Sequence, residues 1–143
     1  MVTIFDTAKY ILEKKGAMSP MKLQKLCYYS QAWNLAWNNE PLFQEDFEAW
    51  ATGPVCENLH IIIGRKNNVA STDIEGEIEN LSEKQKRNID KVLSYYGDMD
   101  DHYLYQLSVM EEPYKNAHDG IPNGIGSDRI ITRKSMLKYY CVR

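Results

Sequence analysis

Apolar residues recur at the spacing of an α-helix along most of this chain of 143 residues. Three of the periodic stretches begin at a good helix-capping residue and stop at glycine or asparagine: residues 3–16, 19–39 and 82–97. Shorter stretches follow the same period near residues 53–64, 100–112, 114–118 and 132–141. Apolar helix faces are stable when they are buried against one another. The pattern therefore predicts a mostly α fold, a single compact domain of about six or seven helices over residues 1–143 with at most a minor strand element.

Local start signals support the longest helices. Thr3 with Asp6, and Ser82 with Gln85, have the spacing of capping boxes, in which each side chain hydrogen-bonds the backbone of the other residue. Pro20 suits the first turn of the second helix, because its missing N–H has no intrahelical partner there. These signals fix the expected starts to within a residue or two.

Between the helices the period is lost in three places. Residues 41–52 are expected to form a loop or a short extended segment, and Gly53-Pro54 to open the third helix. Residues 66–81 are polar and predict a loop with one short strand near Val69. The turn residues of the 120–126 stretch predict another loop.

Charge is distributed unevenly, although the net charge is only −3. No Lys or Arg lies between Lys25 and Arg65, whereas several acidic residues do: Glu40, Glu45, Asp46, Glu48 and Glu57. After Asp128 the balance reverses, and the charged residues are all basic: Arg129, Arg133, Lys134, Lys138 and Arg143. Such asymmetry favours a partner that binds in one orientation. The alternative is that these charges are solvated faces of helices.

Cysteine usage and the N-terminus bear on the compartment. Cys27, Cys56 and Cys141 are odd in number and widely spaced, which is typical of reduced thiols. The first residues show no basic segment followed by an apolar run, and no stretch approaches the roughly 20 apolar residues that span a bilayer. We therefore expect a cytoplasmic protein.

Three groups of residues are candidates for a chemical site. Cys56 and His60 lie four apart on an expected helix, but further ligands at a metal-binding spacing are missing, so no metal is predicted. The glycines of residues 120–126 lack the preceding strand and the closing Lys of a phosphate loop. Glu111 and Glu112 are adjacent and point in different directions on a helix end, which favours capping and solvation over acid–base catalysis. No cofactor is expected.

Aromatic residues are concentrated in the first third of the chain. Trp33 lies within a continuous helical stripe and is expected in the core, whereas Trp37 and Trp50 are open between core and surface. Trp and Tyr dominate the energetics of protein interfaces, so the exposed members of this group would mark a binding surface.

Several short motifs together resemble one known family. The string from Lys22 to Tyr29 is followed by Pro41-Leu42-Phe43, Glu48-Ala49-Trp50 and Gly53-Pro54-Val55. This order resembles the signature of the Panacea domain, the phage-associated SocA/GepA-like family. Tyr96-Gly97 and the Glu-x-Pro-aromatic element at 111–114 extend the resemblance, with Tyr114 in place of the usual Trp. The Thr-His pair that commonly precedes this element is replaced by Ser108 and Val109.

The resemblance implies a protein-binding module and not an enzyme, since the family is associated with antitoxins. It implies a toxin protein as partner and permits a further role as an adaptor that delivers the toxin to a protease. We expect the partner to be occluded by an aromatic surface that the acidic stretch steers. The residues predicted to bind it are Trp37, Phe43, Glu45, Asp46, Glu48, Trp50, Pro54 and Glu57.

A second hypothesis is a nucleic-acid-binding regulator that uses the basic residues 129–143, interleaved with Tyr139 and Tyr140. The acidic pI of about 5.6 and the absence of a recognisable DNA-binding motif weigh against it. In either case we expect a monomer or a dimer without membrane association.

Overall fold

The computed structural model describes residues 1–141 and is mostly helical, as the sequence predicts. Over this range seven α-helices are present: α1 (Ile4–Lys15), α2 (Pro20–Asn38), α3 (Glu57–Ile63), α4 (Glu83–Tyr96), α5 (Asp101–Met110), α6 (Glu112–Ala117) and α7 (Arg133–Cys141). They are joined by three strands and two short 3₁₀ helices: β1 (Phe47–Trp50), β2 (Gly53–Val55), β3 (Ile130–Ile131), η1 (Ser71–Asp73) and η2 (Ile78–Asn80).

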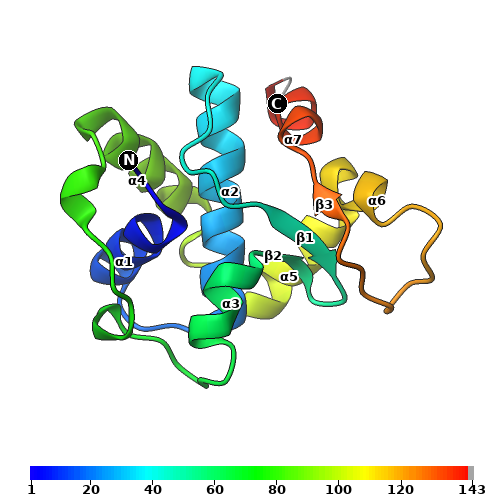
Figure 1. Ribbon diagram of the computed structural model, residues 1–143, viewed down its shortest axis with the longest axis horizontal. Helices are drawn as coiled ribbons and strands as arrows, with labels where there is room; N and C mark the ends of the chain where they lie inside the picture. Colours follow the sequence, from blue (N-terminus) through cyan, green and yellow to red (C-terminus); the bar gives the residue numbers. More distant parts are fainter. Residues whose placement is uncertain (142–143) are drawn as a thin grey trace.

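Helix α2 is the centre of the fold. It contacts α1, α4, α5, α7 and β2, and Figure 1 shows it running between α1 and α4 on one side and the small sheet with α6 and α7 on the other. Its middle is buried on nearly every face, including Leu23, Leu26, Tyr28 and Tyr29. A helix that is buried all round must supply core residues to several neighbours at once. Helices α1, α4, α5 and α7 therefore pack on α2 more than on one another, whereas α6 packs on α5 and α7.

The capping signals are confirmed. The Thr3 and Asp6 pair forms both hydrogen bonds of a capping box at the start of α1, and Ser82 and Gln85 do the same at α4. Ser19 caps α2 through Lys22 N–H, with Pro20 in the first turn. These bonds satisfy backbone donors that a helix start otherwise leaves without partners.

The long 66–81 connection is held against α1 by a buried carboxylate. Asp6 accepts hydrogen bonds from the backbone N–H groups of Thr3 and Glu77 and from the side-chain amide of Asn80. Burial by itself raises the pKa of this carboxyl, but the hydrogen bonds outweigh that effect and hold the pKa below its ordinary value. At Val69 the expected strand is only an isolated bridge to Met18.

The expectation for Gly53-Pro54 is wrong, because these residues form β2 and not the start of α3. Trp50 pairs with Gly53 across a two-residue turn, and Ala49 pairs with Pro54. The missing N–H of Pro54 does not interrupt the ladder, since Ala49 directs its own N–H and C=O to Arg129 and Ser127 on the other side. Helix α3 begins only at Glu57.

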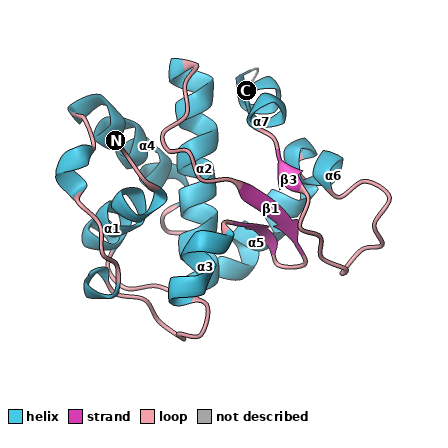
Figure 2. Ribbon diagram, in the orientation of Figure 1, coloured by secondary structure: helices cyan, strands magenta, loops and turns pink. Residues whose placement is uncertain are grey.

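The three strands form one antiparallel sheet in the order β2-β1-β3 (Figure 2). β1 lies in the middle, and Phe47 pairs with Ile131 of β3. Along β1, Phe47 and Ala49 are buried while Glu48 and Trp50 are half-buried, as the alternation of a strand requires. The sheet thus presents Glu48 and Trp50 on its outer face.

Among residues 1–141, no helix is long and apolar enough to cross a membrane.

Candidate protein-binding site

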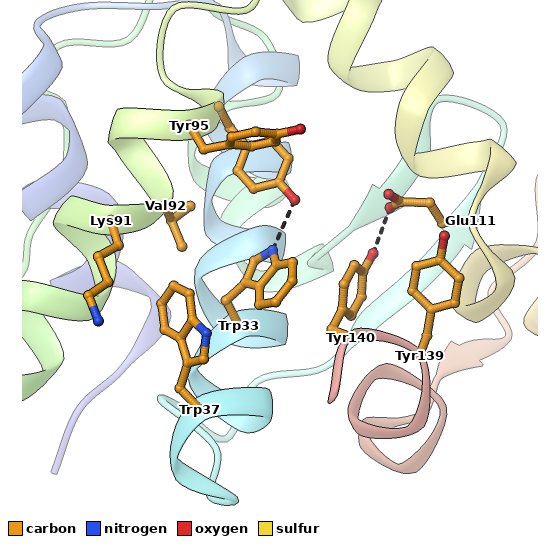
Figure 3. A pocket seen from close by; sticks show the side chains of 9 residues that line it. Trp33, Trp37, Lys91, Val92, Tyr95, Glu111, Tyr139 and Tyr140 are labelled. Carbon is orange, nitrogen blue, oxygen red and sulfur yellow. Dashed lines mark hydrogen bonds between the residues drawn. The ribbon is translucent and has the colours of Figure 1, made fainter. Parts of the chain in front are cut away.

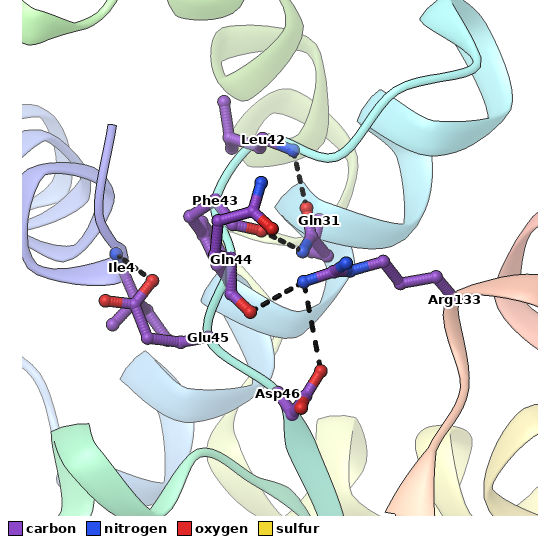
Figure 4. A network of polar contacts seen from close by, with 8 residues as sticks. All are labelled: Ile4, Gln31, Leu42, Phe43, Gln44, Glu45, Asp46 and Arg133. Carbon is purple, nitrogen blue, oxygen red and sulfur yellow. Dashed lines mark hydrogen bonds and ion pairs between the residues drawn. The ribbon is translucent and has the colours of Figure 1, made fainter. Parts of the chain in front are cut away.

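Residues 40–46, the acidic segment before β1, are fixed by contacts from both halves of the chain (Figure 4). The side-chain amide of Gln31 donates to the carbonyl of Phe43 at 2.8 Å and accepts from Leu42 N–H at 2.7 Å. Arg133 of α7 donates to the carbonyl of Gln44 at 2.6 Å. Through these bonds α2 and α7 hold the segment in one conformation.

Two of the predicted steering residues take part in that framework. Glu45 accepts a hydrogen bond from the N–H of Ile4 at 3.1 Å, at the start of α1. Asp46 lies 3.9 Å from the Arg133 guanidinium. Both carboxylates thus help to hold the segment, and each has a partner within the chain.

A shallow hollow of about 330 Å³ lies over the turn between β1 and β2. It is lined by Trp50 and Ala51, by Glu48 of β1 and Glu57 of α3, and by the segment Gly126–Ser127–Asp128. Its three carboxylates, from Glu48, Glu57 and Asp128, make it a negatively charged concavity with one indole ring. We refer to it below as the acidic hollow.

Trp50 is held in place at the acidic hollow by several contacts. Its indole N–H donates to Glu48 at 2.8 Å, and its ring meets the exposed His60 ring edge-on at 4.7 Å. Its carbonyl accepts a hydrogen bond of 2.6 Å from the Tyr114 hydroxyl of α6. The half-buried indole is therefore oriented before any partner arrives, which lowers the entropy lost on binding.

A buried lysine supports the hairpin from below. The Lys25 side chain is fully buried, and its ammonium donates to the carbonyl of Pro54 at 3.2 Å. Gly53 has a φ of +99°, a conformation that favours glycine, and a Cβ there would also lie 2.8 Å from the Lys25 Cε. Burial lowers the pKa of Lys25 to about 7, against the attraction of Asp101, which favours the charged form.

A second, deeper concavity lies between α2, α4 and α7 (Figure 3). Its volume is about 460 Å³, and six aromatic side chains line it together with Val92, Lys91 and Glu111: Trp33, Trp37, Tyr95, Tyr96, Tyr139 and Tyr140. Trp37 and Tyr95 are exposed at its mouth, whereas Tyr96 and Tyr140 are buried at its base. We call it the aromatic pocket.

Contacts between rings fix the shape of the aromatic pocket. The Trp33 indole N–H donates to the Tyr96 hydroxyl at 2.9 Å. Trp33 also lies with its ring centroid 5.4 Å from that of Trp37 and 5.3 Å from that of Tyr140. Behind the pocket Tyr29 stacks on Tyr96 at 4.0 Å. The sequence predicts a core position for Trp33. Its ring is partly buried against the core and forms one wall of the pocket.

Glu111 closes one end of the aromatic pocket. It occupies the residue before α6, but its side chain makes no cap hydrogen bond there, so the expected capping role is wrong. One carboxylate oxygen instead accepts from the hydroxyls of Tyr140 at 2.6 Å and Tyr29 at 2.8 Å. Burial and the Glu111 charge both raise the pKa of these two tyrosines, so they remain neutral donors.

The predicted binding residues therefore do not form one surface. Glu48, Trp50 and Glu57 meet at the acidic hollow, and Trp37 lies at the aromatic pocket. Phe43 is only 1% exposed and packs against Phe47, and Pro54 is buried, so neither side chain lines the surface as expected. The sequence showed helical stripes containing Trp33, Tyr96 and Tyr140, but gave no sign that they enclose a pocket.

Two cations of the basic C-terminal segment are engaged within the chain. Arg129 donates to the carbonyl of Asp119 at 2.6 Å, and Arg133 binds the acidic segment. Lys134 and Lys138 are exposed on α7, and Arg143 lies outside the described residues.

The two residues considered as metal ligands, Cys56 and His60, have other surroundings: Cys56 is buried, and His60 packs on Trp50. Within residues 1–141, no cluster of three or more His, Cys, Asp or Glu could hold a metal ion.

Over residues 1–141, seven helices centred on α2 form a small helical domain whose surface carries an acidic hollow and an aromatic pocket. A family model described as "Antitoxin SocA-like, Panacea domain" matches residues 23–115, more than half of the chain. The chain therefore belongs to the SocA-like antitoxin family with a Panacea domain, which confirms the resemblance in its motifs. No curated protein and no solved structure matched the chain.

Proposed function

We propose that this chain is an antitoxin that neutralises a toxin protein in the cytoplasm by direct contact, without catalysing a reaction. Membership of a SocA-like antitoxin family supports the toxin as partner. The three cysteines are free thiols, which agrees with a reducing compartment. The proposal predicts that the chain and its toxin form a complex that can be isolated.

The acidic hollow is the proposed contact surface, and the observation that carries this choice is the fixed position of Trp50. Its indole is bonded to Glu48 and packed on His60, and the exposed carboxylates of Glu57 and Asp128 lie beside it. An oriented aromatic ring surrounded by charges of one sign is typical of a hot spot that a complementary surface approaches under electrostatic steering. The complementary surface of the toxin is therefore expected to be basic.

Co-expression with the product of the neighbouring gene tests the proposal. We expect that product to arrest growth when expressed alone, and growth to return when this chain is expressed with it. The two proteins should also co-purify. A neighbour that is harmless alone, or toxic whether or not this chain is present, would refute the antitoxin function.

Delivery to a protease is a further step that the family association suggests, and it has a different signature from occlusion. Under occlusion alone, the toxin accumulates in an inactive complex and its half-life does not shorten. Under delivery, the half-life of the toxin falls when this chain is present and recovers when the protease is deleted. A pulse-chase measurement of toxin levels in the rescued cells separates the two.

A further inference from the structure

The aromatic pocket has a composition that differs from an ordinary apolar groove. Six aromatic rings surround a space of about 460 Å³, a carboxylate from Glu111 lies at one end, and an ammonium from Lys91 lies at the other. Aromatic faces carry negative potential and attract cations. A carboxylate within such a wall adds a full negative charge. Together these features favour a positively charged ligand.

The chain itself demonstrates that the walls accept a cation. The Lys91 ammonium lies over the Trp37 ring, 5.0 Å from its centroid. This contact is at the mouth, where Trp37 is 43% exposed, and Figure 3 shows Lys91 on the opposite side of Trp33 from Glu111. The end of the pocket that Tyr139, Tyr140 and Glu111 line offers aromatic rings next to an opposite charge.

The geometry points to the aromatic pocket as a recognition site for the guanidinium of an arginine side chain on a partner protein. A guanidinium is planar, so it stacks on an indole or phenol ring while its edge donates hydrogen bonds to a carboxylate. Glu111 supplies that carboxylate, and Figure 3 shows the Tyr139 and Tyr140 rings next to it. A quaternary ammonium ion carries the same charge but has no N–H to donate, and so matches the rings alone.

The identification of the partner as the toxin rests on the proposed function. Binding of an arginine guanidinium in the aromatic pocket does not depend on it. The acidic hollow and the aromatic pocket share no lining residue. Substitutions at one therefore leave the side chains of the other in place. Loss of the arginine site and loss of toxin neutralisation through Trp50 can be observed separately.

A titration of the isolated full chain tests the site. N-acetyl-arginine amide is the probe, and N-acetyl-citrulline amide, which has nearly the same shape without the charge, is its matched control. We expect saturable shifts of the Trp33 and Trp37 indole N–H resonances with a dissociation constant on the order of 1 mM, as for a ligand of this size. The citrulline compound should bind at least tenfold more weakly.

Three variants locate the binding. Glu111→Gln keeps an acceptor for the tyrosine hydroxyls and should weaken the arginine probe about tenfold, while Trp37→Ala at the exposed mouth should weaken it severalfold. Lys91→Met removes a like charge and should strengthen binding about two- to fivefold, which a purely apolar pocket would not show. Unfolding curves confirm that each variant is folded.

The assignment is overturned by any of three results. The first is no saturation by the arginine probe up to tens of millimolar. The second is equal binding of the citrulline compound. The third is tetramethylammonium binding at least as tightly as the arginine probe, which would identify the pocket as a site for a quaternary ammonium compound instead. Arginine binding that Glu111→Gln leaves unchanged would also contradict it.

Discussion

The acidic hollow and the aromatic pocket each present a tryptophan at the surface, but they are built in different ways. The indole ring of Trp50 in the hollow contacts near neighbours in the sequence, Glu48 and His60, while Tyr114 binds only its backbone carbonyl. Trp33 and Trp37 of the pocket share α2 and meet residues that lie far along the chain, on α4 and α7. The hollow is formed by one hairpin, the start of the helix after it and the 126–128 segment, whereas the pocket exists only where three helices meet.

The difference has consequences for stability and for binding. A side chain held by local contacts on an outer sheet face can be removed while the core stays intact. A side chain that joins three helices is part of the core packing, and its removal leaves a cavity between them. We therefore expect changes at the hollow to alter function first, and changes deep in the pocket to alter folding first.

The largest effect is expected for Trp33→Ala. The ring contacts Trp37 and Tyr140 and donates a hydrogen bond to Tyr96, so its loss should lower the free energy of unfolding by about 3 kcal/mol. Urea unfolding followed by circular dichroism measures this. Trp37→Ala is the control on the same helix and should cost less than about 1 kcal/mol, because that ring is exposed. Equal losses for both would contradict the division between wall and mouth.

The hairpin under the hollow should show a pH dependence from Lys25. Its pKa in the folded chain is about 7, below its ordinary value of 10.5, so between these values the unfolded chain binds a proton that the folded chain does not. Stability therefore rises with pH above about 7, by up to about 1.4 kcal/mol per unit, and is lost as the pH falls back to 7. Below pH 7 this contribution is constant.

The window for that measurement is about pH 7 to 8.5. Above it, Cys27 and Cys56 oppose the trend, because burial raises the pKa of both thiols in the folded chain. Lys25→Met removes the titrating group and should flatten the slope, which chemical unfolding at several pH values will show. A slope that Lys25→Met leaves unchanged would mean that another group causes it.

At the hollow, Trp50→Ala should weaken toxin binding by about 2 kcal/mol, the scale of a central aromatic residue in an interface. The cost to folding should be smaller than that of Trp33→Ala, since the indole is half-buried on the outer face of the sheet. Isothermal titration with the toxin and thermal melts of both variants decide this. Should Trp50→Ala unfold the domain as severely as Trp33→Ala, Trp50 belongs to the core and the hollow is not the binding surface.

The smallest effect concerns the surface charges. Glu57→Lys at the hollow should slow association with the toxin and reduce its salt dependence, with little change in the dissociation rate. The matched variant Lys134→Glu with Lys138→Glu, on exposed positions of α7, should leave neutralisation intact. Arg133 is unsuitable for this comparison because it holds Gln44 and Asp46. Stopped-flow kinetics at two salt concentrations test both, and loss of neutralisation through α7 alone would favour the nucleic-acid hypothesis.

Contacts between residues close in the sequence were sufficient to predict where most of the helices lie. The capping boxes at Thr3 and Ser82 are confirmed, and Gly97 follows the last residue of α4 as expected. A cap is a contact between residues three apart, so it can be recognised without knowing the rest of the fold. The motifs from Lys22 to Val55 likewise sufficed to identify the family, because such signatures are linear.

Tertiary structure decided the remaining features, since each depends on contacts between distant residues. Gly53-Pro54 became a strand because it pairs with β1, and Phe43 became buried because Gln31 and Arg133 hold its segment against the core. The aromatic pocket joins residues from 33 to 140, and its α7 wall lies outside the family match. A sequence pattern gives the period of each helix face, but not which faces meet and which leave a space between them.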